Sequence, residues 1–113
     1  MKMNRLLLPA FSFLLLAGFI SGSVASAQQL SQSRKAELTV LVRQDCGSCH
    51  GMTLKGGLGK PLLPHNIAVF DVDELAELIL EGVPGTPMPP WKELLTRQEA
   101  NWIASKLKKG FNQ

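Results

Sequence analysis

Both cysteines of this 113-residue chain lie in one short stretch, DCGSCHG, which covers residues 45–51. Two cysteines separated by only two residues could close a very small disulfide loop, and such a loop removes little conformational entropy from the unfolded chain. A small domain usually needs an additional cross-link, because its apolar core alone gives marginal stability. The sequence therefore predicts a fold without a structural disulfide, in which some other group supplies the nucleus.

The N-terminal segment has the pattern of a secretory signal peptide. Lys2 and Arg5 precede an apolar run at residues 6–20, and a small-residue stretch follows and ends at Ala27. This order predicts export to the periplasm with cleavage after Ala27. The alternative is a retained membrane anchor, but Pro9 interrupts the apolar run, which is shorter than the ~20 residues that a spanning helix needs. No cysteine directly follows the run, so a lipid anchor is not expected.

Cleavage would leave residues 28–113 as the mature protein, which is enough for one small domain. It would also remove Lys2 and Arg5, so that the formal net charge falls from +3 to about +1. The basic character of the whole chain thus comes largely from the export signal. The composition gives no reason to expect a nucleic-acid partner.

The first mature helix is expected at residues 34–45, ending at the cysteine motif. Ser31 or Ser33 could cap its N-terminus. The apolar side chains expected on one face are Leu38, Leu41 and Val42. The next segment, residues 51–66, contains four glycines and two prolines and is expected to be a loop.

A second helix is expected from Asp71, which forms a capping pair with Glu74, to Gly82, which ends it. Its predicted buried face is Leu75, Leu78 and Ile79. Residues 83–91 then contain four prolines around Met88, which predicts a stiff, extended loop.

The last helix is expected within residues 96–110, where Thr96 and Glu99 form a capping box. Lysines lie near its C-terminal end, where the helix dipole favours cations: Lys106, Lys108 and Lys109. No segment alternates like a β-strand. The sequence predicts an all-α domain of three to four helices.

Three kinds of chemistry use a Cys-x-x-Cys motif. A dithiol oxidoreductase would place it after a strand in an α/β fold, and no strand is predicted here. A structural zinc site needs four ligands, but this chain has no second cysteine pair, and His65 is its only spare histidine. Covalent attachment of haem c explains both thiols and the histidine that follows, so Cys46 and Cys49 are the predicted attachment points and His50 an iron ligand.

The second axial ligand can be sought by elimination. Met52 is too close to His50 to reach the opposite face of the iron, which leaves Met88 and His65. Met88 is favoured because the prolines around it can hold a weak thioether ligand in place. An iron with both axial positions filled transfers electrons and does not bind substrate.

These features together resemble the small class I cytochromes c. The order is a helix, CxxCHG, a glycine-rich loop, a helix, a methionine-proline loop and a C-terminal amphipathic helix. More narrowly, the stretches LVRQDCGSCHGMTLKGGLG, EGVPGTPMPPW and EANWIASKL are similar to cytochrome c55X. This family comprises small periplasmic cytochromes encoded with the haem-cd nitrite reductase of denitrifying bacteria.

The resemblance implies thioether bonds at Cys46 and Cys49 and iron ligation by His50 and Met88. In class I cytochromes a Gly-Pro-x-Leu segment offers a backbone carbonyl to the proximal histidine. The corresponding residues 59–62 read Gly-Lys-Pro-Leu, which leaves open which carbonyl contacts the histidine. The fold also implies that residues of the first and last helices meet near the haem edge, and that Trp91 packs beside the ligand or a propionate. The residues expected at that crossing are Leu38, Leu41, Trp102 and Ile103.

The predicted function is single-electron transfer, not catalysis. The resemblance implies a role with nitrite reductase, either as its electron donor or in maturation of its haem d cofactor. A general shuttle from a quinol-oxidising complex to a terminal oxidase is the alternative, and a haem enzyme or gas sensor is a third possibility. Lys55, Lys60 and Lys92 are expected around the exposed haem edge, where they would steer a redox partner.

Overall fold

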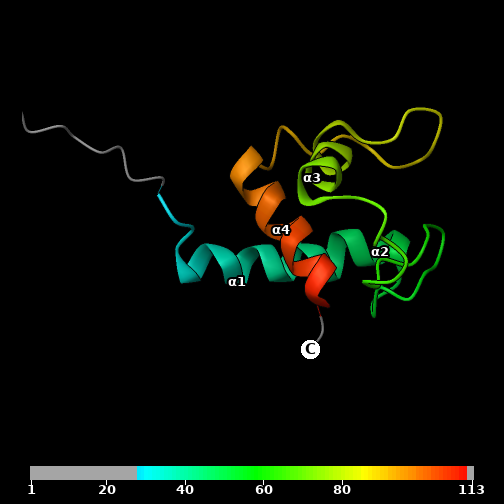
Figure 1. The fold of residues 1–113 in the computed structure, drawn as a ribbon, viewed down its shortest axis with the longest axis horizontal. Helices are drawn as coiled ribbons and strands as arrows, with labels where there is room; N and C mark the ends of the chain where they lie inside the picture. The colour runs from blue at the N-terminus through cyan, green and yellow to red at the C-terminus, as the bar shows by residue number, and fades with distance from the viewer. Residues whose placement is uncertain (1–27, 112–113) are drawn as a thin grey trace, which may run out of the picture.

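The computed structural model describes residues 28–111, and the signal peptide predicted at residues 1–27 lies outside this part. The described residues contain helices and loops and no strand, so the all-α prediction is confirmed. Figure 1 shows the arrangement of the helices. Their bounds are α1 Gln32–Leu41, η1 Val42–Cys46, α2 Gly47–His50, α3 Val72–Glu81 and α4 Arg97–Lys109.

The first helical segment is longer than expected. Ser31 caps it, because its hydroxyl accepts a hydrogen bond from the amide of Arg34 at 3.1 Å. The predicted end at residue 45 is wrong, since the chain continues through the π-helical η1 into α2 and leaves the helix only at Gly51, where φ is +89°. The cysteine motif therefore lies within helix, and a π-helical turn of the kind often found at functional sites leads into it.

Helix α3 has the predicted ends. Asp71 and Glu74 form a complete capping box, and Gly82 terminates the helix with a positive φ. Its buried face differs in part from the prediction, because Leu78 and Ile79 are only half-buried. The side chains of α3 that fill the core are Leu75, Ala76 and Leu80.

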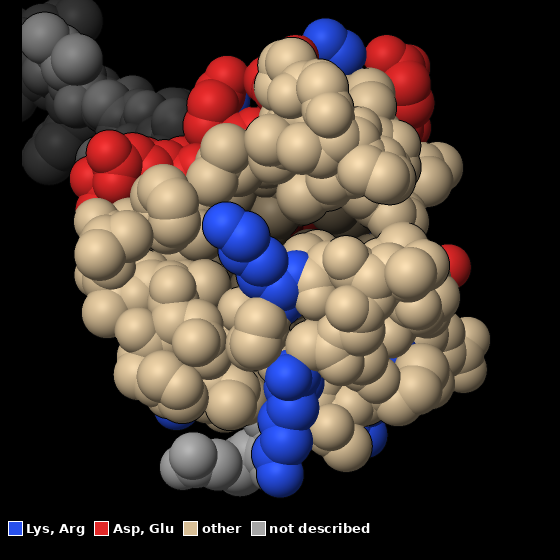
Figure 2. Space-filling model, turned by 90° about the vertical axis from the view of Figure 1, so that its right-hand side faces the viewer, with Lys and Arg blue, Asp and Glu red and all other residues tan. Residues whose placement is uncertain are grey.

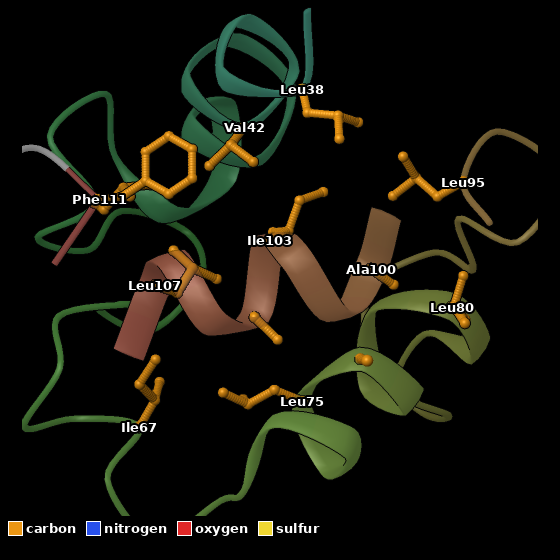
Figure 3. Close-up of a cluster of buried hydrophobic side chains, with 13 residues drawn as sticks. Leu38, Val42, Ile67, Leu75, Leu80, Leu95, Ala100, Ile103, Leu107 and Phe111 are labelled. Carbon is orange, nitrogen blue, oxygen red and sulfur yellow. The ribbon is translucent and has the colours of Figure 1, made fainter. Parts of the chain in front are cut away.

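Helix α4 also begins and ends as predicted. Thr96 and Glu99 form a capping box, and the three lysines lie in the last turn before Gly110. Figure 3 shows α4 between the first helical segment and α3. Ile103 points from α4 toward Leu38 and Val42, and α3 lies on the opposite side of α4. Leu41, Trp91 and Trp102 pack against this cluster from partly buried positions. The expected meeting of the first and last helices is confirmed.

One ion pair joins the beginnings of α1 and α4. The guanidinium Nε of Arg34 donates to the carboxylate of Glu99 at 2.5 Å, and Glu99 is only 7% exposed. The same carboxylate closes the capping box by accepting from the amide of Thr96 at 2.7 Å. The bond from Arg34 lowers the pKa of Glu99, against the effect of burial, and the bonds from Thr96 add to the lowering. Glu99 therefore stabilises both the start of α4 and the helix crossing.

We expect Glu99→Gln to lower the free energy of unfolding at neutral pH and to make stability less sensitive to acid. The stabilisation from a lowered carboxyl pKa is complete above the pKa of the unfolded chain and is lost as the pH falls through the folded value. Denaturant unfolding between about pH 7 and about pH 3 measures this dependence. Glu37→Gln is the control, because Glu37 binds the same Arg34 from an exposed position. Equal effects of the two substitutions would contradict the prediction.

Candidate haem-binding site

The cysteine and histidine motif lies at the C-terminal end of the first helical segment. Cys46 ends η1 and packs half-buried against the core, whereas Cys49 in α2 is exposed. His50 is the last residue of α2 and is partly buried. Both thiols are free of disulfide bonds. One helical segment therefore presents two thiols and one imidazole together.

The ring of His50 is held by the backbone of the following loop. Its Nδ1 lies 2.6 Å from the carbonyl oxygen of Lys60. A carbonyl can only accept, so Nδ1 carries a proton, and in the neutral imidazole the lone pair is then on Nε2. This identifies the carbonyl that the sequence left open. A neutral imidazole with its outer nitrogen fixed in this way is the usual arrangement for a metal-ligating histidine.

The glycines of this loop allow the chain to pass close to the motif. A Cβ on Gly59 would lie 2.7 Å from Nδ1 of His50, and a Cβ on Gly57 would lie 2.7 Å from the carbonyl oxygen of Cys49. The amide of Gly59 also donates to the Cys49 carbonyl at 2.7 Å. The sequence indicated Gly57 only as a loop residue, and it placed Gly59 in the segment that offers a carbonyl to His50 without predicting this close packing. The dense Gly-Gly-x-Gly spacing directly after the motif is the signal that could have identified their role.

Met88 lies in the loop that follows α3. Its side chain is partly buried, its amide donates to the hydroxyl of Thr86 at 3.3 Å, and its carbonyl accepts from the amide of Val83 at 3.3 Å. Figure 1 shows this loop and the loop after α2 at the same end of the molecule. Figure 2 views that end and shows a recess between its upper and lower parts. The loops that carry Met88 and surround His50 therefore flank one face of the molecule.

The surroundings of the motif do not suit the two other kinds of Cys-x-x-Cys site. Burial, with a smaller effect of Asp45, raises the pKa of the Cys46 thiol to about 11, whereas a reactive dithiol needs a lowered pKa. Among residues 28–111, which include all cysteines and histidines, no three side chains are grouped to hold a metal ion. His65 is exposed on its loop. Two free thiols beside an oriented imidazole are the donor set that haem c requires.

The lysines predicted around the site differ in their charge environment. Lys55 and Lys60 are exposed on the loop after α2. Lys92 instead forms an ion pair with Glu81 at 2.9 Å, which raises the lysine pKa. Between the first two lysines lies Leu58, which is 95% exposed. Of these three lysines, only Lys55 and Lys60 are therefore without an ion pair among those of the described residues, and Lys92 contributes less to the basic surface than expected.

Comparison with known proteins shows similarity to c-type cytochromes. The family described as cytochrome c oxidase, cbb3-type, subunit III, matches residues 33–105. Cytochrome c55X of Paracoccus denitrificans is 48% identical over 100 residues, which cover 88% of this chain and 92% of the relative. The solved structure of a c-type cytochrome, NirC, has a TM-score of 0.70 and 43% identity, and covers 72% of this chain and 95% of its own.

A longer protein also contains a similar part. The structure of dihydro-heme d1 dehydrogenase NirN in complex with DHE has a TM-score of 0.60 and 31% identity. The match covers 66% of this chain but only 16% of the dehydrogenase. The similarity therefore concerns one small part of that enzyme.

We expect Gly59→Ala to displace either the His50 ring or the loop, and to lower the free energy of unfolding by about 1–3 kcal/mol through overpacking. Lys60→Ala is the matched control, because it keeps the backbone carbonyl that accepts from Nδ1. Denaturant unfolding measures the loss of stability, and the exchange rate of the Nδ1 proton by NMR reports the hydrogen bond. A Gly59→Ala protein with slow exchange and unchanged stability would contradict the predicted close packing.

Proposed function

Because this chain belongs to the cytochrome c55X family, we propose that it is a one-electron carrier with a single covalently attached haem c. Cys46 and Cys49 would form the thioether bonds, and Nε2 of His50 would bind the iron. The haem supplies an iron that alternates between two oxidation states. The observation that carries this assignment is the contact between His50 and the Lys60 carbonyl, since it leaves Nε2 as the free ligand beside both thiols.

Met88 is the proposed ligand on the other side of the iron. Its backbone is held at both amide and carbonyl, as a weak thioether ligand requires. His65, the other candidate, is exposed on a different loop. Ligation by histidine and methionine fills both axial positions and raises the reduction potential relative to two histidines. An iron with both axial positions occupied suits an electron carrier, because an enzyme or a gas sensor needs a free position for its ligand.

The proposed physiological role is in the nitrite reductase system of denitrification. Similarity to cytochrome c55X covers most of the chain, and part of a dihydro-heme d1 dehydrogenase is also similar. Both similarities support electron transfer to nitrite reductase or in maturation of its haem d cofactor. A general shuttle between a quinol-oxidising complex and a terminal oxidase is the alternative. Deletion of the gene would impair aerobic respiration under that alternative and nitrite reduction under the proposal.

The proposed location is the periplasm, after cleavage of residues 1–27 behind Ala27. The leader pattern of the sequence supports this location. Within residues 28–111 no helix has the length and apolar character needed to cross a membrane. The mature domain would then meet its redox partners by diffusion.

We expect the reduced, haem-loaded protein to show a c-type absorption spectrum that carbon monoxide does not change. Met88→Ala should free one axial position of the iron. Carbon monoxide should then shift the spectrum completely at a concentration that leaves the wild type unaffected. The control is His65→Ala, which should behave like the wild type. A wild-type protein that binds carbon monoxide readily would contradict the carrier function, and an effect of His65→Ala in place of Met88→Ala would reassign the ligand.

We expect charge to steer the partner through Lys55 and Lys60. Changing both to Glu should slow electron transfer to nitrite reductase by about tenfold at low ionic strength, because electrostatic steering changes association rates by this order. Stopped-flow kinetics over a range of salt concentrations measures the effect. Lys92→Gln is the control and should have a smaller effect, because Glu81 already neutralises Lys92. Rates that do not depend on salt would exclude a steering role for these lysines.

A further inference from the structure

The loop that carries Met88 is closed at its base. The amide of Trp91 donates to the carbonyl oxygens of Ile79 at 3.2 Å and Leu80 at 3.1 Å, and the amide of Lys92 donates to the Leu80 carbonyl at 3.2 Å. The last carbonyls of a helix lack partners within the helix. Here the amides of Trp91 and Lys92, at the end of the loop, are the hydrogen-bond partners of these carbonyls. Both ends of residues 82–91 are therefore fixed at the C-terminal end of α3 (Figure 1).

A tight turn shapes the first half of this loop. The amide of Thr86 donates to the carbonyl of Val83 at 3.2 Å, with Pro84 in the second position and Gly85 in the third at a φ of +77°. These are the features of a type II turn. The hydroxyl of Thr86 donates to the same Val83 carbonyl at 2.7 Å and accepts from the amide of Met88. The turn thereby directs the chain back toward the end of α3.

Gly82 lies where the backbone of Met88 meets the end of α3. Its φ of 69° and ψ of −174° belong to a region that is essentially restricted to glycine. A Cβ at this position would lie 2.7 Å from the carbonyl oxygen of Met88 and 2.8 Å from the carbonyl carbon of Pro89. These are backbone atoms, so they cannot avoid the clash by a change of rotamer. Any side chain at residue 82 must move the segment that contains Met88.

We propose that Gly82 is a positioning residue for the methionine ligand, because the absence of its side chain allows the Met88 backbone to lie against the end of α3. The proposal rests on the proposed ligation of iron by Met88. It adds that the strength of this ligation depends on a residue six positions away in the sequence. Gly85 provides the comparison, since it also has a positive φ but a Cβ there would have no neighbour within 4 Å.

The test compares Gly82→Ala with Gly85→Ala in the haem-loaded protein. Both substitutions place a side chain at a positive φ, but only the first one contacts the Met88 segment. In the ferric state imidazole displaces a thioether ligand, and the loss of the sulfur-to-iron charge-transfer absorption reports the displacement. We expect Gly82→Ala to lower the imidazole concentration at half-displacement by about tenfold or more. Gly85→Ala, which strains the turn but meets no neighbouring atom, should lower it by a clearly smaller factor.

Two results would overturn the proposal. One is a Gly82→Ala protein that resists imidazole as well as the wild type does, and the other is equal weakening by both substitutions. Met88→Ala separates this inference from the proposed function. If Met88→Ala leaves the charge-transfer absorption intact, Met88 is not the ligand and both proposals fail. If Met88→Ala abolishes it and Gly82→Ala has no effect, only the role of Gly82 is wrong.

A second pair of variants tests the same positioning if Gly82→Ala does not fold. Thr86→Val removes the hydroxyl that binds the Met88 amide, whereas Thr86→Ser keeps it. We expect Thr86→Val to lower the imidazole concentration at half-displacement and Thr86→Ser to restore it toward the wild-type value. If Thr86→Val and Thr86→Ser both match the wild type, the loop does not control the ligand through its backbone, and the proposal is overturned.

Discussion

The hydrogen bond between Nδ1 of His50 and the Lys60 carbonyl is the contact on which the proposed site depends. It fixes the tautomer and the direction of the imidazole, and it connects the end of α2 to the loop that follows. The bond can form only because Gly59 has no side chain, since a Cβ there would overlap the ring. The orientation of the His50 ring is thus determined by a backbone carbonyl and not by a side chain. The identity of the Lys60 side chain is not important for it, which explains why a lysine can stand where class I cytochromes usually have proline.

In the loop after α2 and in the loop after α3, a glycine allows the backbone to pack closely against a neighbouring segment. On one side Gly59 allows the chain to approach His50, and on the other side Gly82 allows the Met88 backbone to approach the end of α3. In both places a Cβ atom would lie less than 3 Å from neighbouring atoms that have little freedom to move. Both proposed iron ligands are therefore positioned by close backbone packing, which the two glycines allow, and by backbone hydrogen bonds. Such restraint limits the conformational change that a redox site undergoes between its two states.

The features that the sequence predicted well are local ones. The capping boxes of Asp71 and Thr96 involve residues three positions apart, so their geometry follows from helix termini alone. The continuation of the first helix through Cys46 and the pairing of Arg34 with Glu99 depend on packing between distant segments. A charged side chain such as Lys92 looks the same in sequence whether it is free or paired with Glu81. These parts of the fold and of the candidate site could not be derived from spacing.

The ion pairs also explain how a chain with little net charge could direct a partner. The acidic residues of α3 are partly neutralised, because Glu81 binds Lys92 and Glu77 binds Arg97. The lysines of the loop after α2 have no such partners among the ion pairs of the described chain. Residues 71–97 nevertheless stay acidic, with six carboxylates against two basic side chains, whereas the loop after α2 is basic. An asymmetric field of this kind favours one docking orientation without strong binding, which suits a carrier that must release its partner after each electron.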